Sequence, residues 1–381
     1  MKVLTVLSKL EMGGIEKTLL SCIPYLKDHG VEMFVLCSLG GALDEDYKKL
    51  GVKLIDFGAH KKPFKDAKFL RKILKEQKFD IVHSRYGHTS GVFAKVCKEA
   101  GIPFLISIHN ERAMFRNSWI GKPVLKNLRV WYLNYHKNLS VKYATKIIGH
   151  SKANLKYFTT DAGYVGKEGL YEVLYNGVDF SKFEKYPQLD LQKAEELEKF
   201  LKDKEKVLVH IGSFKEQKNH IFLIDVFKKL NPKENSYGLI LLGVGSLMEE
   251  VKSHAAFLDI QDQILFVGME TNIAPYLYAS DLFVFPSLYE GFGNVLIEAQ
   301  YANLPVAASD IAPHYEASFE AYHKYFYSPN NTEQAKDNIE KLLSQDNTEL
   351  IKEAKIFSEA FSIQRMANNL MDIFNKSING K

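Results

Sequence analysis

The chain has 381 residues, enough for two or three domains of ordinary size. Its contents of 46% hydrophobic and 25% charged residues are typical of soluble globular proteins and exclude extensive disorder. Three cysteines without a CxxC pair exclude a disulfide scaffold and a cysteine-based metal site, and favour reduced thiols in the cytoplasm. No stretch reaches about 18 uncharged apolar residues, so we expect neither a signal peptide nor a membrane span.

Charge is distributed unevenly along the chain. Residues 1–180 carry 29 Lys and Arg against 17 Asp and Glu, whereas residues 181–381 carry 21 against 29. A basic first half and an acidic second half predict two domains with different partners. A basic surface favours phosphates, nucleic acid or anionic lipid.

In chain order, apolar β-rich runs alternate with amphipathic helical patterns. In the first half we expect strands at 3–7, 33–37, 53–57, 81–84, 104–108 and 146–148, and helices at 16–29, 66–77 and 89–100. In the second half we expect strands at 207–211, 238–242, 264–267, 282–285 and 305–308, and helices at 221–230, 247–257 and 294–303. Continuous apolar strands between helices predict an α/β protein with two doubly wound, Rossmann-like parallel sheets.

The domain boundary is expected near residues 176–206, where an Asn-Gly turn precedes a charged helical segment at 190–204. We place a first domain at residues 1–180 and a second domain at residues 181–360. Residues 361–381 would form a C-terminal helix that is long enough to return to the first domain. The pattern over residues 349–378 predicts one continuous helix.

The first strand is followed by Gly13 and Gly14 and then by a helix. Glycines there let backbone N–H groups approach a phosphate or a sugar at the helix N-terminus, although a tight turn alone also requires glycine. The motif is not GxGxxG and no acidic residue ends the second strand, which disfavours a nicotinamide dinucleotide.

The most informative segment is PSLYEGFGNVLIEA at residues 286–299. An apolar strand leads into two glycines and a helix whose N–H groups and dipole suit an anion. Glu290 precedes the helix and Glu298 lies on it, and carboxylates suit sugar hydroxyls. The pattern fits a nucleotide-sugar, with one carboxylate for the transferred sugar and one for the ribose; a plain strand–turn–helix is the alternative.

Taken together, these motifs resemble the family 4 retaining glycosyltransferases of the GT-B fold, over nearly the whole chain. The resemblance runs through GGIE at 13–16, FDIVHSRYG at 79–87, IIGHSKANL at 147–155, VLYNGVDFSKF at 173–183, GSFKEQKNH at 212–220, LLGVGS at 241–246 and the segment at 286–299. It implies two Rossmann-like domains that face a central cleft, with residues 1–180 as the acceptor-side domain and residues 181–360 as the nucleotide-sugar-binding domain.

The resemblance also implies roles for single residues. Glu290 would bind donor-sugar hydroxyls, Glu298 the ribose, and Lys218 the diphosphate. His109 would line the donor-sugar pocket, so that His109, Lys218 and Glu290 form the implied catalytic set. Without the resemblance, we would interpret His109 as a hydrogen-bonded polar residue at the end of a strand, and Lys218 as a solvent-exposed lysine in a loop. The implied donor-binding residues are Gly14, Ser213, Lys218, Glu290, Gly291, Phe292, Gly293, Asn294, Val295 and Glu298.

Two positions depart from the family pattern. Ser213 stands where arginine is usual, which removes one cation from the diphosphate, unless Lys215 or another arginine compensates. Val244 stands where an acidic residue is common. Both departures bear on donor affinity and donor choice.

The implied reaction breaks the bond between the anomeric carbon and the phosphate. Lys218 and the helix N-terminus would stabilise the charge on the leaving group, and the departing phosphate would take the proton of the acceptor. The resemblance implies no metal and no cofactor. The acidic residues at 44–46 match the DxD pattern of metal-binding sites, but we interpret them as the polar start of a helix.

Residues 112–156 carry ten basic residues, no acidic residue and several aromatic ones. Basic residues with tryptophan and tyrosine suit the surface of an anionic membrane, or an anionic acceptor. The expected face comprises Arg112, Arg116, Lys122, Lys126 and Arg129. An ordinary helix with a basic outer side is the alternative. No recognisable nucleic-acid-binding motif accompanies these basic residues, so we expect no nucleic-acid partner.

The sequence therefore predicts a retaining, metal-independent hexosyltransferase. It would move a sugar from a nucleotide donor, here expected to be a UDP-sugar, to a lipid-linked glycan in bacterial surface-polysaccharide assembly. We expect it in the cytoplasm, on the inner face of the membrane. Two alternatives stay open: a catalytically silent GT-B protein that binds nucleotide-sugar or acts as a scaffold, and a glycosyltransferase with a soluble acceptor.

Overall fold

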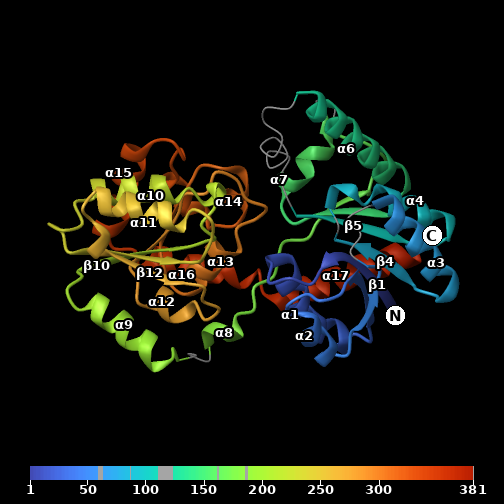
Figure 1. Ribbon diagram of the computed structural model, residues 1–381, viewed down its shortest axis with the longest axis horizontal. Coiled ribbons are helices and arrows are strands. Elements are labelled where there is room, and N and C mark those ends of the chain that lie inside the picture. Colours follow the sequence, from blue (N-terminus) through green and yellow to red (C-terminus); the bar gives the residue numbers. More distant parts are fainter. Residues whose placement is uncertain (59–62, 86, 110–122, 161–162, 185–187, 381) are drawn as a thin grey trace. The chain divides into compact units, whose positions relative to one another are not determined.

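The computed structural model describes residues 1–58, 63–85, 87–109, 123–160, 163–184 and 188–380. Its contacts divide the chain into two compact units (Figure 1). Unit 1 comprises Met1–Gly177 together with Ile363–Lys381, and unit 2 comprises Val178–Ser362. The C-terminal segment therefore belongs to unit 1, although unit 2 separates the two in sequence.

Unit 1 is built on a seven-stranded sheet with the order β3-β2-β1-β4-β5-β6-β9. The strands are β1 (Lys2–Lys9), β2 (Glu32–Ser38), β3 (Lys53–Asp56), β4 (Ile81–Ser84), β5 (Phe104–Ile108), β6 (Lys146–Gly149) and β9 (Tyr171–Val173). Every neighbouring pair is parallel. All carboxyl ends therefore lie along one edge, where the loops that follow the strands can form a site.

Helices cover both faces of this sheet (Figure 1). They are α1 (Gly14–Asp28), α2 (Asp44–Lys49), α3 (Pro63–Glu76), α4 (Gly91–Glu99), α6 (Pro123–Tyr143), α7 (Lys152–Leu155) and α17 (Ile363–Asn379), with 3-10 turns η1 (Gly87–Thr89) and η2 (Lys156–Phe158) and a hairpin of β7 (Thr159–Thr160) and β8 (Gly163–Tyr164). The acidic run at residues 44–46 opens α2, as expected for a helix start.

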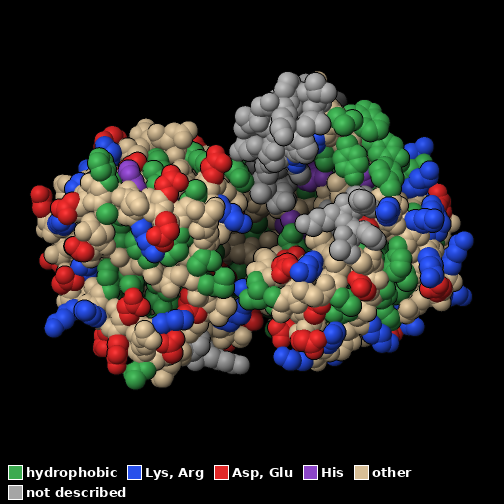
Figure 2. All heavy atoms as spheres, viewed as in Figure 1, with side chains coloured by type: hydrophobic (Ala, Val, Ile, Leu, Met, Phe, Trp, Pro, Cys, Tyr) green, Lys and Arg blue, Asp and Glu red, His purple; other side chains and the backbone are tan. Residues whose placement is uncertain are grey.

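One side of α6 packs against α4, and another side is exposed. A side chain at Gly91 of α4 would overlap the backbone of His136, so glycine permits this close approach. His136 is fully buried on the packed side of α6. Away from it, Trp131 and Leu128 keep 63% and 60% of their surface exposed. Hydrophobic side chains gather over α6 in the space-filling view (Figure 2).

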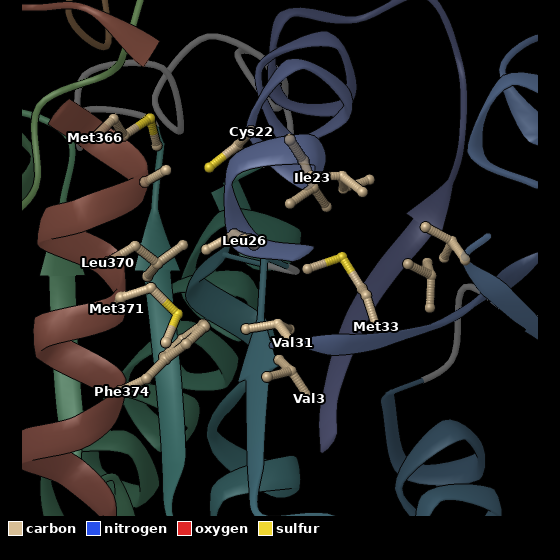
Figure 3. Packing of buried hydrophobic residues seen from close by; sticks show 14 of the residues in the cluster. Val3, Cys22, Ile23, Leu26, Val31, Met33, Met366, Leu370, Met371 and Phe374 are labelled. Carbon is tan, nitrogen blue, oxygen red and sulfur yellow. The ribbon is translucent and has the colours of Figure 1, made fainter. Parts of the chain in front are cut away.

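On the opposite face of the sheet, α17 lies beside α1 (Figure 3). Buried apolar residues of α17 recur at spacings of three and four, which gives the helix one apolar side. Met366, Leu370 and Phe374 from this side pack into one core with Cys22 and Leu26 of α1. This burial ties the C-terminal helix to the N-terminal fold.

The predicted continuous helix over residues 349–378 is wrong, because the helix is interrupted at residues 360–362. The helix α16 (Thr348–Glu359) ends before the break and α17 begins after it. The carbonyl of Phe361 accepts a hydrogen bond of 2.8 Å from the Val178 amide, and Ser362 forms a β-bridge with Val178. Pairing with a distant segment replaces the helical hydrogen bonds at this point.

Unit 2 contains a five-stranded parallel sheet with the order β12-β11-β10-β13-β14. The strands are β10 (Lys206–Ile211), β11 (Tyr237–Leu242), β12 (Ile264–Gly268), β13 (Leu282–Phe285) and β14 (Val306–Ala308). The chain leaves the central strand β10 in one direction and returns to its other side at β13. Such a switch in strand order opens a crevice at the carboxyl ends, where ligands of α/β proteins bind.

The remaining elements of unit 2 are mainly the helices that flank this sheet. They are α8 (Ser181–Glu184), α9 (Leu191–Leu201), α10 (His220–Lys229), α11 (Met248–Phe257), α12 (Ala274–Tyr278), α13 (Asn294–Tyr301), α14 (Ala312–Glu316), α15 (Thr332–Ser344) and α16, with 3-10 turns η3 (Glu216–Lys218), η4 (Gln261–Gln263) and η5 (Glu320–Tyr325). Two parallel sheets with flanking helices confirm the predicted α/β class with two Rossmann-like folds.

No helix in the described parts of the chain combines the length and the apolar character needed to cross a membrane.

Candidate active site

In unit 2, two loops meet at the switch between β10 and β13. The first runs from the end of β10 through η3, and the second connects β13 to α13. The Leu288 amide donates a hydrogen bond of 2.8 Å to the Gln217 carbonyl, and Gln217 Nε2 donates one of 2.9 Å to the Tyr289 carbonyl. These bonds hold together the two segments that the sequence marks as the donor site.

An ion pair joins the same two loops. Lys218 Nζ lies 2.6 Å from Glu290 Oε1 and 4.5 Å from the centroid of the Phe285 ring. Only 14% of the Lys218 side chain and 10% of the Glu290 side chain are exposed. Removal of either partner would leave a buried, unpaired charge, which is strongly unfavourable. The structure thus brings two of the three predicted catalytic residues into direct contact.

Glycines allow the loop after β11 to approach the loop after β10. A side chain at Gly243, where φ is +135°, would overlap the Gly212 carbonyl, and one at Gly245 would overlap the Phe214 carbonyl. The Phe214 amide donates to the Val244 carbonyl at 3.1 Å. Ser213, at the position where the family usually has arginine, is half-buried inside this arrangement.

The second loop ends at the N-terminus of α13. Its N-cap is Gly293, with φ of +105°, a conformation that favours glycine. Gly293 has no side chain with which to cap this terminus, and the helix dipole gives the terminus positive character. Asn294 and Val295 form the first turn, and Glu298 follows on the same side of the helix at spacings of four and three. Phe292 is buried, 2% exposed, and its ring packs against Phe361 with 5.6 Å between the ring centroids.

Three buried histidines of unit 2 were not predicted as part of the site. Burial lowers the pKa of His220 and His314 to about 4, and it also lowers the pKa of His210. His220 stacks on Phe214 at 4.0 Å, and His314 Nδ1 lies 2.8 Å from the Ser309 carbonyl. These rings are neutral at pH 7 and act as packing behind the loops, so Lys218 is the cation among them.

In unit 1, the predicted residues Gly14 and His109 lie at the carboxyl edge of the sheet. A side chain at Gly14 would meet nothing within 4 Å, whereas one at Gly13 would overlap the Glu16 carboxylate. His109 follows β5 and stacks on His150, which follows β6, with 4.1 Å between the ring centroids. Burial, and then the charges of His150 and Arg85, hold the pKa of His109 well below its usual value. We therefore treat His109 as a neutral ring.

Arg85 follows β4 directly and was missed as a site residue. It is only 4% exposed, and none of its guanidinium nitrogens has a hydrogen-bond partner within the part of the chain that the structure describes. Arg85 stands in HSRYG at residues 83–87, within one of the segments that carry the family resemblance. An arginine at a strand end is usually solvated, so its type alone gave no reason to single it out.

Most of the predicted basic face cannot be placed. Arg112, Arg116 and Lys122 lie outside the described residues. Lys126 lies in α6, and Arg129, on the same helix, is half-buried. What the structure adds is the apolar part of this region, namely the exposed Leu128, Val130, Trp131 and Tyr135 of α6.

Two further features bear on the assignment. Within the described residues, no group of three or more His, Cys, Asp or Glu side chains could hold a metal ion. An apolar groove of about 670 Å³ between α9 and α12 includes Leu191, Leu197 and Tyr278 in its lining, and none of the predicted site residues. The ion pair and the glycine-rich loops therefore define the candidate site better than this groove does.

Comparison with known proteins agrees with this architecture. Residues 12–182 match the family described as Glycosyltransferase Family 4, and residues 192–360 match the family described as Glycosyl transferases group 1. Among solved structures, Anabaena Alr3699/HepE in complex with UDP has a TM-score of 0.78 at 19% identity, covering 99% of this chain and 100% of its own. A glycosyltransferase from Rickettsia africae ESF-5 also has a TM-score of 0.78, at 22% identity, covering 100% of this chain and 99% of its own.

Two curated relatives extend over most of the chain. The capsular polysaccharide biosynthesis glycosyltransferase CapH of Staphylococcus aureus is 26% identical over 327 residues, 83% of each protein. The UDP-Gal:alpha-D-GlcNAc-diphosphoundecaprenol alpha-1,3-galactosyltransferase of Escherichia coli is 25% identical over 310 residues, 79% of this chain and 77% of its own. With two adjacent family matches and the two-sheet fold, the chain belongs to the family 4 type of GT-B glycosyltransferases.

Proposed function

We propose that this protein transfers a sugar from a UDP-sugar to a lipid-linked glycan during the assembly of a bacterial surface polysaccharide. The observation that carries the proposal is the Lys218–Glu290 pair, which joins the loops that follow β10 and β13, the second of which leads into α13. The names of relatives support the substrate classes. The E. coli relative is named for UDP-Gal and a diphosphoundecaprenol-linked acceptor, and the S. aureus relative for capsular polysaccharide.

The charges of the crevice suit a nucleoside diphosphate-sugar. Lys218 and the N-terminus of α13 offer positive character to the diphosphate. Lys218 already bonds Glu290 at 2.6 Å, so an incoming phosphate adds a second anion to a cation that is held in place. Glu290 is then oriented to accept hydrogen bonds from donor-sugar hydroxyls. Glu298, which lies on α13, would accept hydrogen bonds from the ribose hydroxyls.

Backbone groups complete the proposed donor site. The amides of residues 291–295 would support the sugar and diphosphate. In unit 1, Gly14 has open space beside its backbone and stays a predicted donor-binding residue. Ser213 offers a hydroxyl where the family usually has a guanidinium, so this site holds the diphosphate with less positive charge. A lost charge-assisted hydrogen bond is worth about 1.5–3 kcal/mol, which predicts a modest donor affinity.

We propose transfer with retention of configuration and without a metal. As the bond to the anomeric carbon breaks, negative charge grows on the diphosphate, where Lys218 and α13 stabilise it. The acceptor attacks from the face of the leaving group, whose phosphate oxygen takes the acceptor proton. His109 is a neutral ring, so in this scheme it donates or accepts a hydrogen bond near the sugar and adds no charge.

The exposed side of α6 supports a peripheral contact with the cytoplasmic face of an anionic membrane. Trp131 and Tyr135 stack at 5.9 Å, and both stay exposed. Aromatic side chains with polar edges favour the interface between lipid and water. The surrounding segment, residues 112–156, has ten basic and no acidic residues, which complements anionic headgroups. A lipid-linked acceptor would be met at the same surface.

A donor panel tests the function. The purified protein is incubated with UDP-, GDP- and dTDP-sugars and a polyprenyl diphosphate-sugar acceptor, and nucleoside diphosphate release is measured. We expect release with a UDP-sugar, at least a hundredfold less with Lys218→Ala, and an unchanged rate with Lys233→Ala, which removes an exposed pair with Asp259. Release from no donor, with binding retained, would favour the silent GT-B alternative; equal rates with a soluble glycan would favour the soluble-acceptor alternative.

A further inference from the structure

Unit 1 has its own group of polar side chains at the carboxyl ends of three neighbouring strands. Arg85 follows β4, His109 follows β5 and His150 follows β6. These strands pair in parallel register, β4 with β5 and β5 with β6, so the three residues lie next to one another along one edge. Residues two or four positions apart on a strand point to the same face of a sheet, so Arg85 shares its face with Ile81. Ile81 belongs to the hydrophobic core formed with α1 and α17, and Arg85 therefore lies on the face of the sheet that these helices cover.

Arg85 carries a charge that its described surroundings do not neutralise. Its backbone amide donates to the Val6 carbonyl at 2.9 Å, which fixes the start of the side chain. The guanidinium is buried, and its three nitrogens have no hydrogen-bond partner among the described residues. Burial lowers the pKa of this guanidinium from its usual value, but arginine remains protonated in proteins. A buried cation without an anion is strongly unfavourable, so this position needs a counter-ion.

The described neighbours of Arg85 do not supply that counter-ion. Burial raises the pKa of the Cys22 thiol to about 11 and raises that of Tyr47, so both are neutral at pH 7. Glu16 is half-buried, but its carboxylate lies against Gly13 at the start of α1. Its charge acts on Arg85 through space, and no hydrogen bond joins the two side chains.

The two histidines add polar atoms that also lack partners. His150 Nδ1 lies 2.9 Å from the Leu174 carbonyl, which can only accept, so this nitrogen carries the proton. The Nε2 atoms of His150 and His109 are buried and have no partner within the described chain. Burial and the charge of Arg85 lower the pKa of His150 to about 3, so the ring adds no positive charge while Arg85 is unpaired.

We propose that Arg85, with His109 and His150, forms an anion site in unit 1 that binds a phosphate or diphosphate ester. The guanidinium would bind two phosphate oxygens at once, and the histidine nitrogens would bond a third oxygen or its proton. This inference deepens the proposed function and rests on it for the ligand class. The phosphate comes from one of two sources, the diphosphate of the nucleotide donor or the diphosphate of the lipid-linked acceptor.

Calorimetry on the full chain with three probes tests the site: inorganic pyrophosphate, UDP and farnesyl diphosphate. The variants are Arg85→Gln, the conservative Arg85→Lys, and the control Arg71→Gln, which removes an exposed pair with Glu99. We expect Arg85→Gln to weaken pyrophosphate binding at least tenfold, Arg85→Lys to recover part of it, and Arg71→Gln to change nothing. If the loss extends to farnesyl diphosphate but not to UDP, the acceptor is the source of the phosphate; if it extends to UDP but not to farnesyl diphosphate, the donor is the source.

The inference is overturned if Arg85→Gln binds all three probes like the unmodified protein. If Arg85→Gln does not fold, the Lys218→Ala protein replaces it, because that variant removes the cation of unit 2 and keeps Arg85. Pyrophosphate should still raise its Tm by at least 2 °C; no rise would overturn the inference. A further outcome separates the two proposals. If Lys218→Ala loses UDP binding while Arg85→Gln binds all three probes normally, the proposed function stands and only the Arg85 site is ruled out.

Discussion

The Lys218–Glu290 pair links stability to function at the level of single residues. Both side chains are mostly buried, and the pair joins the loops that follow β10 and β13. An ion pair in this position costs desolvation energy that two apolar residues would avoid. We attribute its presence to the ligand, because the same two charges suit a diphosphate and a sugar.

Stability measurements on three variants separate these two effects. Lys218→Met leaves the Glu290 carboxylate buried without its cation and should lower the free energy of unfolding by about 3 kcal/mol. Lys218→Met combined with Glu290→Leu should recover most of this loss but should not bind a nucleotide-sugar. The control Lys233→Met breaks an exposed pair and should cost less than about 1 kcal/mol. Urea unfolding measures the first effect and calorimetry the second; a double variant no more stable than the single would contradict the pairing argument.

Buried histidines predict how stability depends on pH. Burial lowers the pKa of His88, His136, His220 and His314 to about 4, and that of His150 to about 3. In the unfolded chain histidine titrates near 6.5, so between about pH 6.5 and 4 the unfolded state binds more protons than the folded state. The stability contributed by the neutral rings is complete above about pH 6.5 and falls as the pH is lowered.

The free energy of unfolding should therefore decrease from pH 7 to pH 5, by up to about 1.4 kcal/mol per pH unit for each such histidine. His220→Phe keeps an aromatic ring that can stack on Phe214 and should reduce this slope relative to that of the unmodified protein. Urea titrations at pH 7, 6 and 5 measure both slopes. A wild-type curve that is flat over this range would show that the rings are charged in the folded protein.

At the level of elements, close approach of loops depends on glycine. Gly243 has φ of +135° and its Cβ position overlaps the Gly212 carbonyl, whereas Gly101 has φ of +70° and open space around it. Gly243→Ala should therefore lower the free energy of unfolding by about 1–3 kcal/mol more than Gly101→Ala, which bears only the cost of the positive φ. It should also weaken nucleotide binding, because Gly212 leads into the Lys218 loop. Equal effects of the two substitutions on Tm would contradict this view of the loops.

The α6 helix predicts membrane binding through its apolar side. Replacement of Leu128 and Trp131 by serine should lower binding to phosphatidylglycerol vesicles at least fivefold, while the control Phe257→Ser, also exposed but in unit 2, should not. High salt should weaken the binding of all three proteins, because exposed charges are screened over about 8 Å at physiological ionic strength. Vesicle sedimentation gives the bound fraction; equal binding to neutral phosphatidylcholine would argue against the electrostatic part.

Local sequence predicted some elements well and others poorly, for physical reasons. Strands β4, β5 and β13 have the predicted bounds. For β5 and β13 the reason is that strands buried on both faces are short, mainly apolar runs. Strand β9 has only three residues and carries too little pattern to be recognised. The break between α16 and α17 depends on hydrogen bonding to Val178, which is nearly half the chain away, so no local pattern could reveal it.

The candidate site divides in the same way. The resemblance singled out Lys218 and Glu290, and the structure places them in contact. Arg85 and His150 could not be recognised, because their interest comes from burial without partners, a property of the folded chain. The roles proposed for Glu298, His109 and the glycine-rich loop remain predictions, and the Glu298→Ala variant tests the first of them.

At the level of the whole molecule, each unit presents the carboxyl edge of a parallel sheet with its own polar groups. Unit 2 has a cation and two glutamates beside a helix N-terminus, and unit 1 has an arginine beside two histidines. The charge asymmetry of the sequence agrees with this division, since residues 1–180 carry the excess of Lys and Arg. The central claim is that unit 2 binds the nucleotide-sugar between Lys218, Glu290 and α13.

Steady-state kinetics with a UDP-sugar and acceptor test that claim most directly, with Glu290→Ala and Glu298→Ala compared with the unmodified protein. Glu290 is assigned to the reacting sugar, so Glu290→Ala should lower kcat at least a hundredfold with little change in the donor KM. Glu298 is assigned to the ribose, so Glu298→Ala should raise the donor KM about tenfold or more and leave kcat nearly unchanged. If both variants keep the kcat and KM of the unmodified protein, the donor does not bind at this site and the account is wrong.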